Sequence, residues 1–387
     1  MKVLFPAIVL LLVLSPRSFG GDAVSGSTTY GPPLNSPDPN ERRPTVPQFR
    51  FATPGYHFEF PRDYFNHPAY QTEWWYYSGN LRTNHGREFG FELALFRLGI
   101  AFQKVAKSPW AMDNIYMAHL ALTNLARKRF LYEERLNRSG PGIAGVSQAD
   151  GRVWNGNWQV IWHGNTQQLQ AIADSFTLQL LLRPAKPLVL NGHNGFSEKA
   201  PGPGNASNYF SFTRLNASGT VVLGERRYEV TGSSWMDHEF STTPQGSPVA
   251  GWDWLAIQLN NDTEVMLYRV RLKGGSVSSC SSGTYTDSKG HGHYLGIHGF
   301  VLTPARTWSS PRSPGRYPLQ WSIAIPSLHL QLKATTPLKN QELVTGNSFS
   351  PTYWEGAIRL KGELAGKPIA GVGYLEMTGY AKPLNPR

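Results

Sequence analysis

Short segments rich in aromatic and aliphatic residues, separated by turns of Gly, Asn and Pro, run from about residue 49 to the end of the chain. The clearest pair, residues 73–81 and 88–98, flanks a stretch that contains Asn84 and Gly86, which is the pattern of a β-hairpin. The chain carries 12 Trp, 17 Tyr and 19 Phe together with 39 Gly and 29 Pro, a composition that favours short strands over long helices. The sequence therefore predicts an all-β protein.

The predicted strands form two series of eight. A shared order of aromatic strand, turn, Glu and apolar strand links residues 75–97 to residues 254–271, which indicates a duplicated unit. We therefore expect two antiparallel eight-stranded barrels in tandem, over residues 49–240 and 241–387, each with an interior just large enough for one small ligand. The predicted strands are residues 73–81, 88–98, 115–123, 130–135, 153–162, 169–182, 208–215 and 220–236, then 252–259, 264–272, 279–286, 293–302, 319–325, 328–333, 353–360 and 369–380.

The first twenty residues have the pattern of a secretory signal. Lys2 precedes an apolar stretch over residues 3–14, and small residues follow at Ser18 and Gly20. The stretch is short for a transmembrane helix, although an uncleaved anchor is the alternative. Residues 21–48 are rich in Pro, Gly and Ser and are predicted to be a disordered lead-in. We therefore expect an exported protein, periplasmic or secreted.

Several function classes are not indicated by the sequence. The formal net charge is +11, but Lys and Arg are scattered, so the charge does not indicate a nucleic-acid partner. There is no phosphate-binding glycine loop, no strand-placed GxGxxG and no GxSxG elbow. The single cysteine, Cys280, cannot form an internal disulfide. His291, His293 and His298 lack a full ligand set. We therefore predict no cofactor and no metal.

The densest aromatic stretch spans residues 70–81. Strand alternation places Glu73, Trp75 and Tyr77 on one face and Trp74 and Tyr76 on the other. A carboxylate beside large rings can have a raised pKa and act as an acid. The alternative is a structural Glu73, bonded to backbone or to an arginine, among rings that fill a core.

A second stretch, residues 232–240, carries Asp237, His238 and Glu239 in succession. On a strand, Trp235 shares one face with Asp237 and Glu239, and His238 lies on the other. Burying three ionisable groups is costly, so their presence favours acid–base chemistry. The alternative is an ion-pair network at a domain junction, with Arg97 or Arg271 as the partner. Trp252 and Trp254 follow shortly and offer faces for flat, apolar ligands or cations.

Five segments in order resemble the carotenoid 1,2-hydratase/AttH family. The opening resemblance lies in Glu73-Trp74-Trp75-Tyr76 with Gly79-Asn80-Leu81, continued by Phe89-Gly90-Phe91 through Phe96-Arg97. The central resemblance lies in Trp235-Met236-Asp237-His238-Glu239 and Gly251-Trp252-Asp253-Trp254. The last lies in Tyr353-Trp354-Glu355-Gly356 and in residues 373–380. Phe240 stands where a hydratase-like version of this segment would carry Trp.

The resemblance implies two lipocalin-like domains with a ligand site at or near their junction. It also implies hydro-lyase chemistry, in which water adds across a carbon–carbon double bond of an isoprenoid-like lipophilic substrate. On this basis we hypothesise Asp237 as the acid and His238 as its partner or as the base for water, although strand alternation separates them unless a β-bulge intervenes. Glu73 and Glu239 are the substitutes. The expected substrate walls are Trp75, Tyr76, Tyr77, Trp235, Trp252 and Trp254.

Two other functions fit the same resemblance. One is a non-enzymatic protein that binds a lipophile or associates with a membrane transporter component, and the other is a structural envelope protein without a pocket. A cavity between the domains with a carboxylate facing it would favour the enzyme. A cavity without ionisable residues would favour the carrier, and a filled junction would favour the structural protein.

Overall fold

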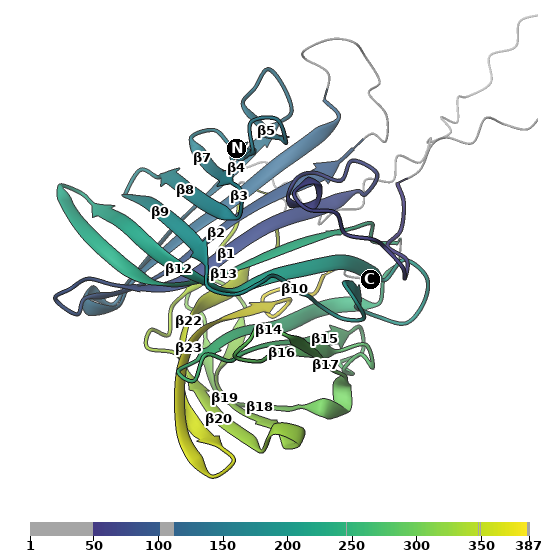
Figure 1. The fold of residues 1–387 in the computed structure, drawn as a ribbon, viewed down its shortest axis with the longest axis vertical. Helices are drawn as coiled ribbons and strands as arrows, with labels where there is room; N and C mark the ends of the chain where they lie inside the picture. Colours follow the sequence, from purple (N-terminus) through teal and green to yellow (C-terminus); the bar gives the residue numbers. More distant parts are fainter. Residues whose placement is uncertain (1–48, 101–111, 245, 347, 349, 385–387) are drawn as a thin grey trace, which may run out of the picture.

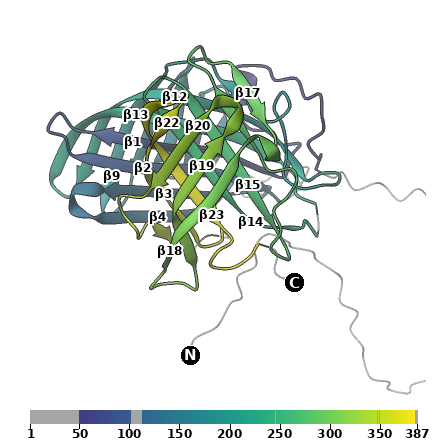
Figure 2. The ribbon, with the colours of Figure 1, turned by 90° about the horizontal axis from the view of Figure 1, so that it is seen from below.

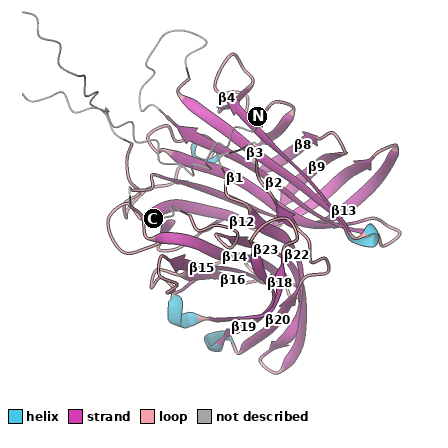
Figure 3. Cartoon of the chain, turned by 180° about the vertical axis from the view of Figure 1, so that it is seen from behind, coloured by secondary structure: helices cyan, strands magenta, loops and turns pink. Residues whose placement is uncertain are grey.

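The computed structural model describes residues 49–100, 112–244, 246–346, 348 and 350–384. Within them the regular secondary structure is almost all strand, with only short 3-10 helices, η1 (Arg62–Tyr64), η2 (Leu125–Arg127), η3 (Ile297–Gly299) and η4 (Pro326–Leu328) (Figure 3). The predicted signal peptide (1–20) and lead-in (21–48) lie outside these residues. Over the same part of the chain, no helix is long and apolar enough to cross a membrane.

The first sheet is antiparallel and contains 13 strands, in the order β4-β3-β2-β1-β13-β12-β9-β8-β7-β6-β5, with β10 and β11 paired to β12. Its strands are β1 (Thr72–Arg82), β2 (Glu88–Gly99), β3 (Asn114–Asn124), β4 (Arg129–Arg138), β5 (Ala144–Ser147), β6 (Arg152–Asn155), β7 (Trp158–His163), β8 (Thr166–Ile172), β9 (Phe176–Pro184), β10 (Val189–Leu190), β11 (Phe196–Glu198), β12 (Ala206–Leu223) and β13 (Arg226–Ser241).

The second sheet is also antiparallel and contains 10 strands, in the order β17-β16-β15-β14-β23-β22-β20-β19-β18, with β21 paired to β22. Its strands are β14 (Val249–Leu259), β15 (Glu264–Leu272), β16 (Ser282–Thr286), β17 (Gly292–Leu295), β18 (Val301–Ser309), β19 (Arg316–Ile325), β20 (Leu330–Thr335), β21 (Glu342–Leu343), β22 (Tyr353–Leu364) and β23 (Lys367–Thr378). The fold is therefore two curled, barrel-like antiparallel sheets in tandem, as predicted.

The two sheets repeat one strand order. In the first, the opening hairpin β1–β2 lies beside the closing strand β13, and β12 follows; in the second, β14–β15 lies beside β23, and β22 follows. This agreement supports the duplicated unit. The residues thought to mark the repeat are not equivalent, however, because Trp75 packs inside the first sheet and Trp254 packs between the sheets.

The strand count and several strand limits differ from the prediction of two sets of eight. The segments predicted at 208–215 and 220–236 are the long strands β12 and β13, and the chain turns between them at Gly224, which has φ +58°. The Asn-Ala-Ser-Gly run at residues 216–219, which looks like a turn, lies within β12 instead. The segment predicted at 293–302 contains β17, η3 and the start of β18, and Gly296 and Gly299 interrupt it.

Each curled sheet has its own packed interior. Trp75, Tyr77 and Phe210 belong to the first interior, together with residues from β2, β3, β7, β8 and β9. Trp321 and Trp354 belong to the second. Buried aromatic and aliphatic side chains therefore occupy both interiors.

The outer faces of the two sheets pack against each other. A third apolar cluster joins Tyr76, Trp235 and Tyr209 of the first sheet to Trp254 and Tyr374 of the second. The sheets are stacked one above the other, with β1 next to β23, β2 next to β22 and β12 next to β14 (Figure 1). After a 90° turn, the strands of the second sheet cross those of the first at an angle (Figure 2). Both faces of β1 and β13 are therefore buried, one in a core and one at the junction.

Candidate functional site

A cavity of about 340 Å³ lies at the junction of the two sheets. This volume falls within the range of roughly 300–1,000 Å³ found for small-molecule sites. Large apolar side chains form most of its walls, among them Trp74, Phe96, Leu98, Met117, Trp252, Trp254 and Tyr268. The charged residues in its walls are mostly acidic: Glu73, Glu92, Asp237, Glu239, Glu355 and Glu376, with Lys199 and Arg97 as the basic ones. The cavity thus combines an apolar lining with several buried carboxyl groups.

Asp237 faces this cavity from β13. Its carboxyl group accepts hydrogen bonds from Tyr209 Oη at 2.6 Å, from Ser211 Oγ at 2.5 Å and from the indole N–H of Trp235 at 2.6 Å. Burial raises the pKa of Asp237 to about 7, against the opposing effect of these three donors. Near neutral pH the group therefore exists in both protonation states, as a general acid or base requires.

Glu376 faces the same cavity from β23, in the other sheet. The indole N–H of Trp252 donates to its carboxylate at 2.8 Å, and Thr378 Oγ1 donates at 2.7 Å. Burial raises the pKa of Glu376 to about 7 as well. Each sheet therefore contributes one carboxyl group that titrates near neutrality and is held by a tryptophan.

Two further acids, Glu92 on β2 and Glu355 on β22, meet across the junction. Tyr353 donates to Glu92 Oε1 at 2.9 Å, and Tyr76 donates to Glu355 through a very short contact. Burial raises the pKa of Glu92 to about 8, and it raises the pKa of Glu355 well above its usual value, helped by repulsion from Glu92. Among the described residues, no donor other than these carboxyl groups bonds the second oxygen of Glu92, Oε2, and Glu92 and Glu355 hydrogen-bond each other.

Glu239 and Lys199 form an ion pair in the wall of the cavity. Lys199 Nζ lies 3.0 Å from Glu239 Oε1. It also lies 4.4 Å from the ring centre of Tyr268 and 5.0 Å from that of Tyr209, which are cation–π contacts. Glu239 is thus neutralised and is less suited than Asp237 to acid–base work.

Glu73 and His238 lie on the opposite face of their strands. The register of β1 against β13 is continuous from Thr72–Ser241 to Arg82–Thr231, so no bulge turns His238 toward Asp237. His238 Nε2 instead contacts Glu73 Oε1 at 3.0 Å, inside the first sheet. The structure therefore separates the hypothesised pair Asp237 and His238. Glu73 is among the residues that line the cavity, but its carboxylate oxygens bond His67, His238 and Arg97.

Glu73 is the centre of a buried ion-pair network. Its carboxylate accepts from Arg97 Nε at 3.0 Å and contacts His67 Nδ1 at 2.6 Å, while His67 Nε2 contacts Asp63 at 3.0 Å. Burial opposes ionisation of Glu73, but His67 and Arg97 hold its pKa well below the usual range. This is the structural alternative considered for Glu73, with Arg97 as the arginine.

The same network contains three donor groups that are close enough together to hold a metal. The ligand atoms of His67, Glu73 and His238 lie within 4.8 Å of one another. Both imidazoles, however, already contact one Glu73 oxygen, and Arg97 occupies the other. With a protonated His67, the network is neutral as it stands, so it has no need of a cation. His291 and His293 lie elsewhere, on the surface, against Asp287.

The expected aromatic walls separate into two groups. Trp75 and Tyr77 belong to the first interior, away from the cavity. Tyr76, Trp252 and Trp254 line the cavity, and Trp235 supports Asp237 from the same face of β13. The alternation predicted for residues 73–77 and 235–240 is therefore confirmed, and it decides which residues meet at the junction.

Sequence reasoning missed Glu92, Glu355 and Glu376 as site residues. Each is a single acid within an apolar strand, in the segments Phe91-Glu92-Leu93, Trp354-Glu355-Gly356 and Leu375-Glu376-Met377. A lone carboxylate in a strand buried on both faces is costly without a purpose or a partner. A single acid in such a strand is therefore the sequence signal that could have identified these three residues.

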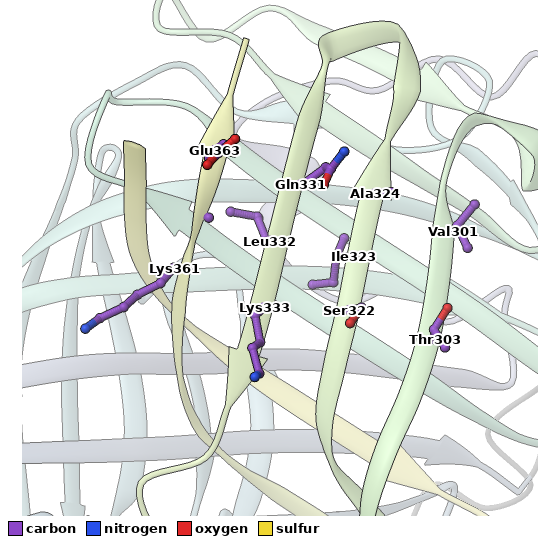
Figure 4. Close-up of a pocket in the computed structure, with 11 residues that line it drawn as sticks. Val301, Thr303, Ser322, Ile323, Ala324, Gln331, Leu332, Lys333, Lys361 and Glu363 are labelled. Atoms are coloured by element: carbon purple, nitrogen blue, oxygen red, sulfur yellow. The ribbon is translucent and has the colours of Figure 1, made fainter. Parts of the chain in front are cut away.

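A second hollow, of about 380 Å³, lies on the outer surface of β18, β19, β20 and β22. Its polar side chains, such as Lys333, Lys361 and Glu363, are exposed and extend away from the strands (Figure 4). Ion pairs between charged groups in open solvent contribute little to binding or stability. We therefore place the candidate site in the junction cavity.

The fold and the cavity define a class: an all-β protein of two curled sheets with a buried acidic site between them. The AttH-like family model matches residues 51–380, so the chain belongs to the AttH-like family. It is similar to the crystal structure of an AttH protein from Nitrosomonas europaea, with 31% identity, a TM-score of 0.78, and coverage of 86% of this chain and 100% of that one.

A second solved structure shares the fold at lower identity. Kievitone hydratase from Nectria haematococca is 16% identical, with a TM-score of 0.64, and the match covers 84% of this chain and 93% of that one. At this identity the likeness shows the fold alone. The comparison with curated proteins finds no match.

Proposed function

We propose that this protein is a hydro-lyase that adds water across a carbon–carbon double bond of a lipophilic, isoprenoid-like substrate held in the junction cavity. The observation that carries the proposal is the Asp237 carboxyl group, which faces an apolar cavity and titrates near neutral pH. An isolated alkene is a weak base, so its hydration requires a positioned acid in a site that excludes bulk water.

The arrangement suits each step of such a reaction. Asp237 gives its proton to one alkene carbon and leaves a carbocation on the other. The faces of Tyr76, Trp252 and Trp254 stabilise that positive charge. Water then attacks the cation, and Glu376, on the opposite sheet, accepts the proton that the water loses. Proton exchange from Glu376 back to Asp237 restores the site, and the net change is the addition of one water molecule.

This assignment replaces His238 with Glu376 as the base for water. The His238 ring lies on the other face of β13 from Asp237, inside the first sheet. It retains Asp237 as the acid and leaves Glu239 as a partner for Lys199. Support for a hydratase comes from the AttH-like family and from its fungal structural neighbour, which is named as a hydratase. Carotenoids are one substrate class within the proposal. Export, and association with a membrane transporter component, are further parts of it and rest on residues 1–20 and on the family resemblance.

Binding of a lipophile without chemistry is the second candidate function. The tryptophan and phenylalanine walls favour it, since they would bind an apolar ligand whatever the carboxyl groups do. The third alternative, a structural protein, would have been favoured by a junction filled with side chains. The cavity at the junction disfavours it.

Heavy-oxygen water separates the two candidate functions. The purified protein is incubated with an unsaturated lipid extract in H₂¹⁸O, and the ligands are analysed by mass spectrometry. A hydro-lyase yields a hydroxylated product that carries the label. Asp237→Asn is expected to slow labelling by about a hundredfold or more, as for loss of a general acid.

Glu342→Gln is the matched control variant. Glu342 is also a buried carboxylate held by three hydroxyl groups, those of Ser310, Ser313 and Tyr317, but it does not line the cavity. Its loss should leave the labelling rate unchanged. An Asp237→Asn variant that labels as fast as the parent would remove Asp237 as the acid. A bound but unlabelled lipid in the parent protein would favour the carrier.

A further inference from the structure

The junction cavity contains more acid than its own basic groups neutralise. Six acidic residues line it, and its two basic side chains are already occupied: Lys199 pairs with Glu239, and Arg97 pairs with Glu73. Among the ion pairs of the described residues, none involves Asp237, Glu92, Glu355 or Glu376. On a chain of formal net charge +11, this local excess of acid is a property of the cavity and not of the composition.

One oxygen of these acids has no donor beyond the neighbouring carboxyl group. Glu92 is 1% exposed and lines the cavity, yet among the described residues no donor other than the Glu355 carboxyl group bonds its Oε2 atom. A polar atom of a buried side chain without a partner is rare in folded proteins. Glu92 and Glu355 hydrogen-bond each other, and burial raises the pKa of Glu92 to about 8 and that of Glu355 well above its usual value. Near neutral pH the pair therefore holds a proton, and a cationic group bound at this place would displace that proton.

The neighbouring groups favour a cation over a neutral donor. Tyr353 and Tyr76 surround the two acids with aromatic rings, and Trp254 packs edge-on against Tyr76 with ring centres 5.1 Å apart. Ring faces attract cations, most strongly in sites shielded from water. His119 contacts Tyr353 at 2.7 Å, but burial lowers its pKa to about 4, so it is neutral and supplies no counter-charge.

A metal ion is a poor match for this place. Metal sites require several ligand atoms that converge on one point. Among the described residues, the one group of three or more donors within 4.8 Å is His67, Glu73 and His238, on the other face of the first sheet. The cavity acids are spread along the walls instead, which suits a larger ion with an apolar body.

We propose that Glu92 and Glu355 form a seat for the ammonium group of an organic cation, and that the cavity binds amphiphilic amines or quaternary ammonium compounds. The apolar part of such a ligand lies against Phe96, Met117 and Trp252. This binding function goes beyond alkene hydration and does not depend on it, since the ligand needs no double bond. The same seat would also stabilise positive charge on a protonated alkene.

The test compares two ligands that differ in a single atom. The probes are para-hydroxybenzyltrimethylammonium and para-neopentylphenol, in which a neutral carbon replaces the charged nitrogen. Binding is measured by calorimetry and by quenching of tryptophan fluorescence. The ammonium compound is expected to bind about tenfold tighter or more, an advantage that cation–π contacts and an ion pair readily supply. Equal affinities for the two probes would overturn the proposal, and this comparison uses the unaltered chain.

Variants then locate the seat. Glu92→Gln and Glu355→Gln should each reduce the preference for the ammonium compound to about threefold or less, while the affinity for para-neopentylphenol changes little. Glu342→Gln should leave the preference intact. A preference that survives both cavity variants would place the cation elsewhere and refute the assignment. Because neither probe carries an isolated alkene, failure of hydration leaves this result unaffected, and failure here leaves the labelling experiment unaffected.

Discussion

Arg97 is the residue whose replacement we expect to cost the most stability. Its side chain is 2% exposed, and its guanidinium group makes four hydrogen bonds. They reach Glu73 Oε2 at 3.0 Å, Asn114 Oδ1 at 3.0 Å, and the carbonyl oxygens of His67 at 2.9 Å and Tyr70 at 2.8 Å. Arg97→Met keeps most of the apolar stem and removes every one of these donors.

The size of the effect follows from what remains after the substitution. Removing one member of a buried ion pair costs about 3–5 kcal/mol, because the other charge stays buried and unpaired. Two backbone carbonyl groups also lose a charged donor, at about 1–3 kcal/mol each, but these costs overlap with the first. We therefore expect a loss of about 4 kcal/mol at neutral pH. The loss should shrink in acid, where Glu73 escapes its unpaired charge by taking a proton.

Urea unfolding followed by tryptophan fluorescence measures the loss. The matched control is Arg227→Met, which makes the same change in an ion pair with Glu229 at 3.0 Å whose side chains are 62% and 75% exposed. An exposed pair of this kind contributes about 0–1 kcal/mol. The reasoning fails if Arg97→Met costs less than about 1 kcal/mol, or no more than Arg227→Met.

Three other outcomes are expected. Tyr209→Phe removes a hydrogen bond that lowers the pKa of Asp237, so this pKa should rise above its value of about 7 in a ¹³C NMR titration, and an unchanged pKa would show that the bond is not formed. Gly232→Ala should destabilise the fold by about 3 kcal/mol in urea, because a Cβ atom there would lie 2.0 Å from the carbonyl oxygen of Asn80; an unshifted midpoint would contradict this close approach. The pKa of Glu73 is lowered in the fold, so its ionised form stabilises the fold fully above the usual pKa of 4.5, and this stabilisation decreases as the pH falls below 4.5, where the unfolded chain takes up the proton; the urea midpoint should therefore drop between about pH 5 and pH 3, and a flat profile would argue against the network.

Strand alternation is the part of the site that could be predicted from the sequence. It separated Trp74 and Tyr76 from Trp75 and Tyr77, and Asp237 from His238, because the direction of a side chain on a strand depends on local geometry alone. Alternation alone does not predict which face of the strand packs in the core and which face lies at the junction. Both faces of β1 are buried and both carry aromatic residues, so hydrophobicity does not distinguish them.

The partners of the acids could not be predicted in the same way. Glu92 and Glu355 are more than 260 positions apart and meet only because the outer faces of the sheets pack together. Glu73 looked like a catalytic candidate because its neutralising partners, His67 and Arg97, come from a loop and from β2. Whether a buried acid is paired depends on such long-range contacts, and these depend on how the sheets are stacked.

The cavity lies on the outer faces of the sheets. Alternate residues of each central strand therefore pack in the core of the sheet and face the cavity. On β13, Met236 packs in the core while Asp237, the next residue, faces the ligand space. Substitutions at the positions that face the cavity can change which ligand is bound without creating a void in the core. A protein built this way can diversify its ligands while its scaffold stays fixed. The site, however, exists only where two halves meet, so neither half could have possessed it alone.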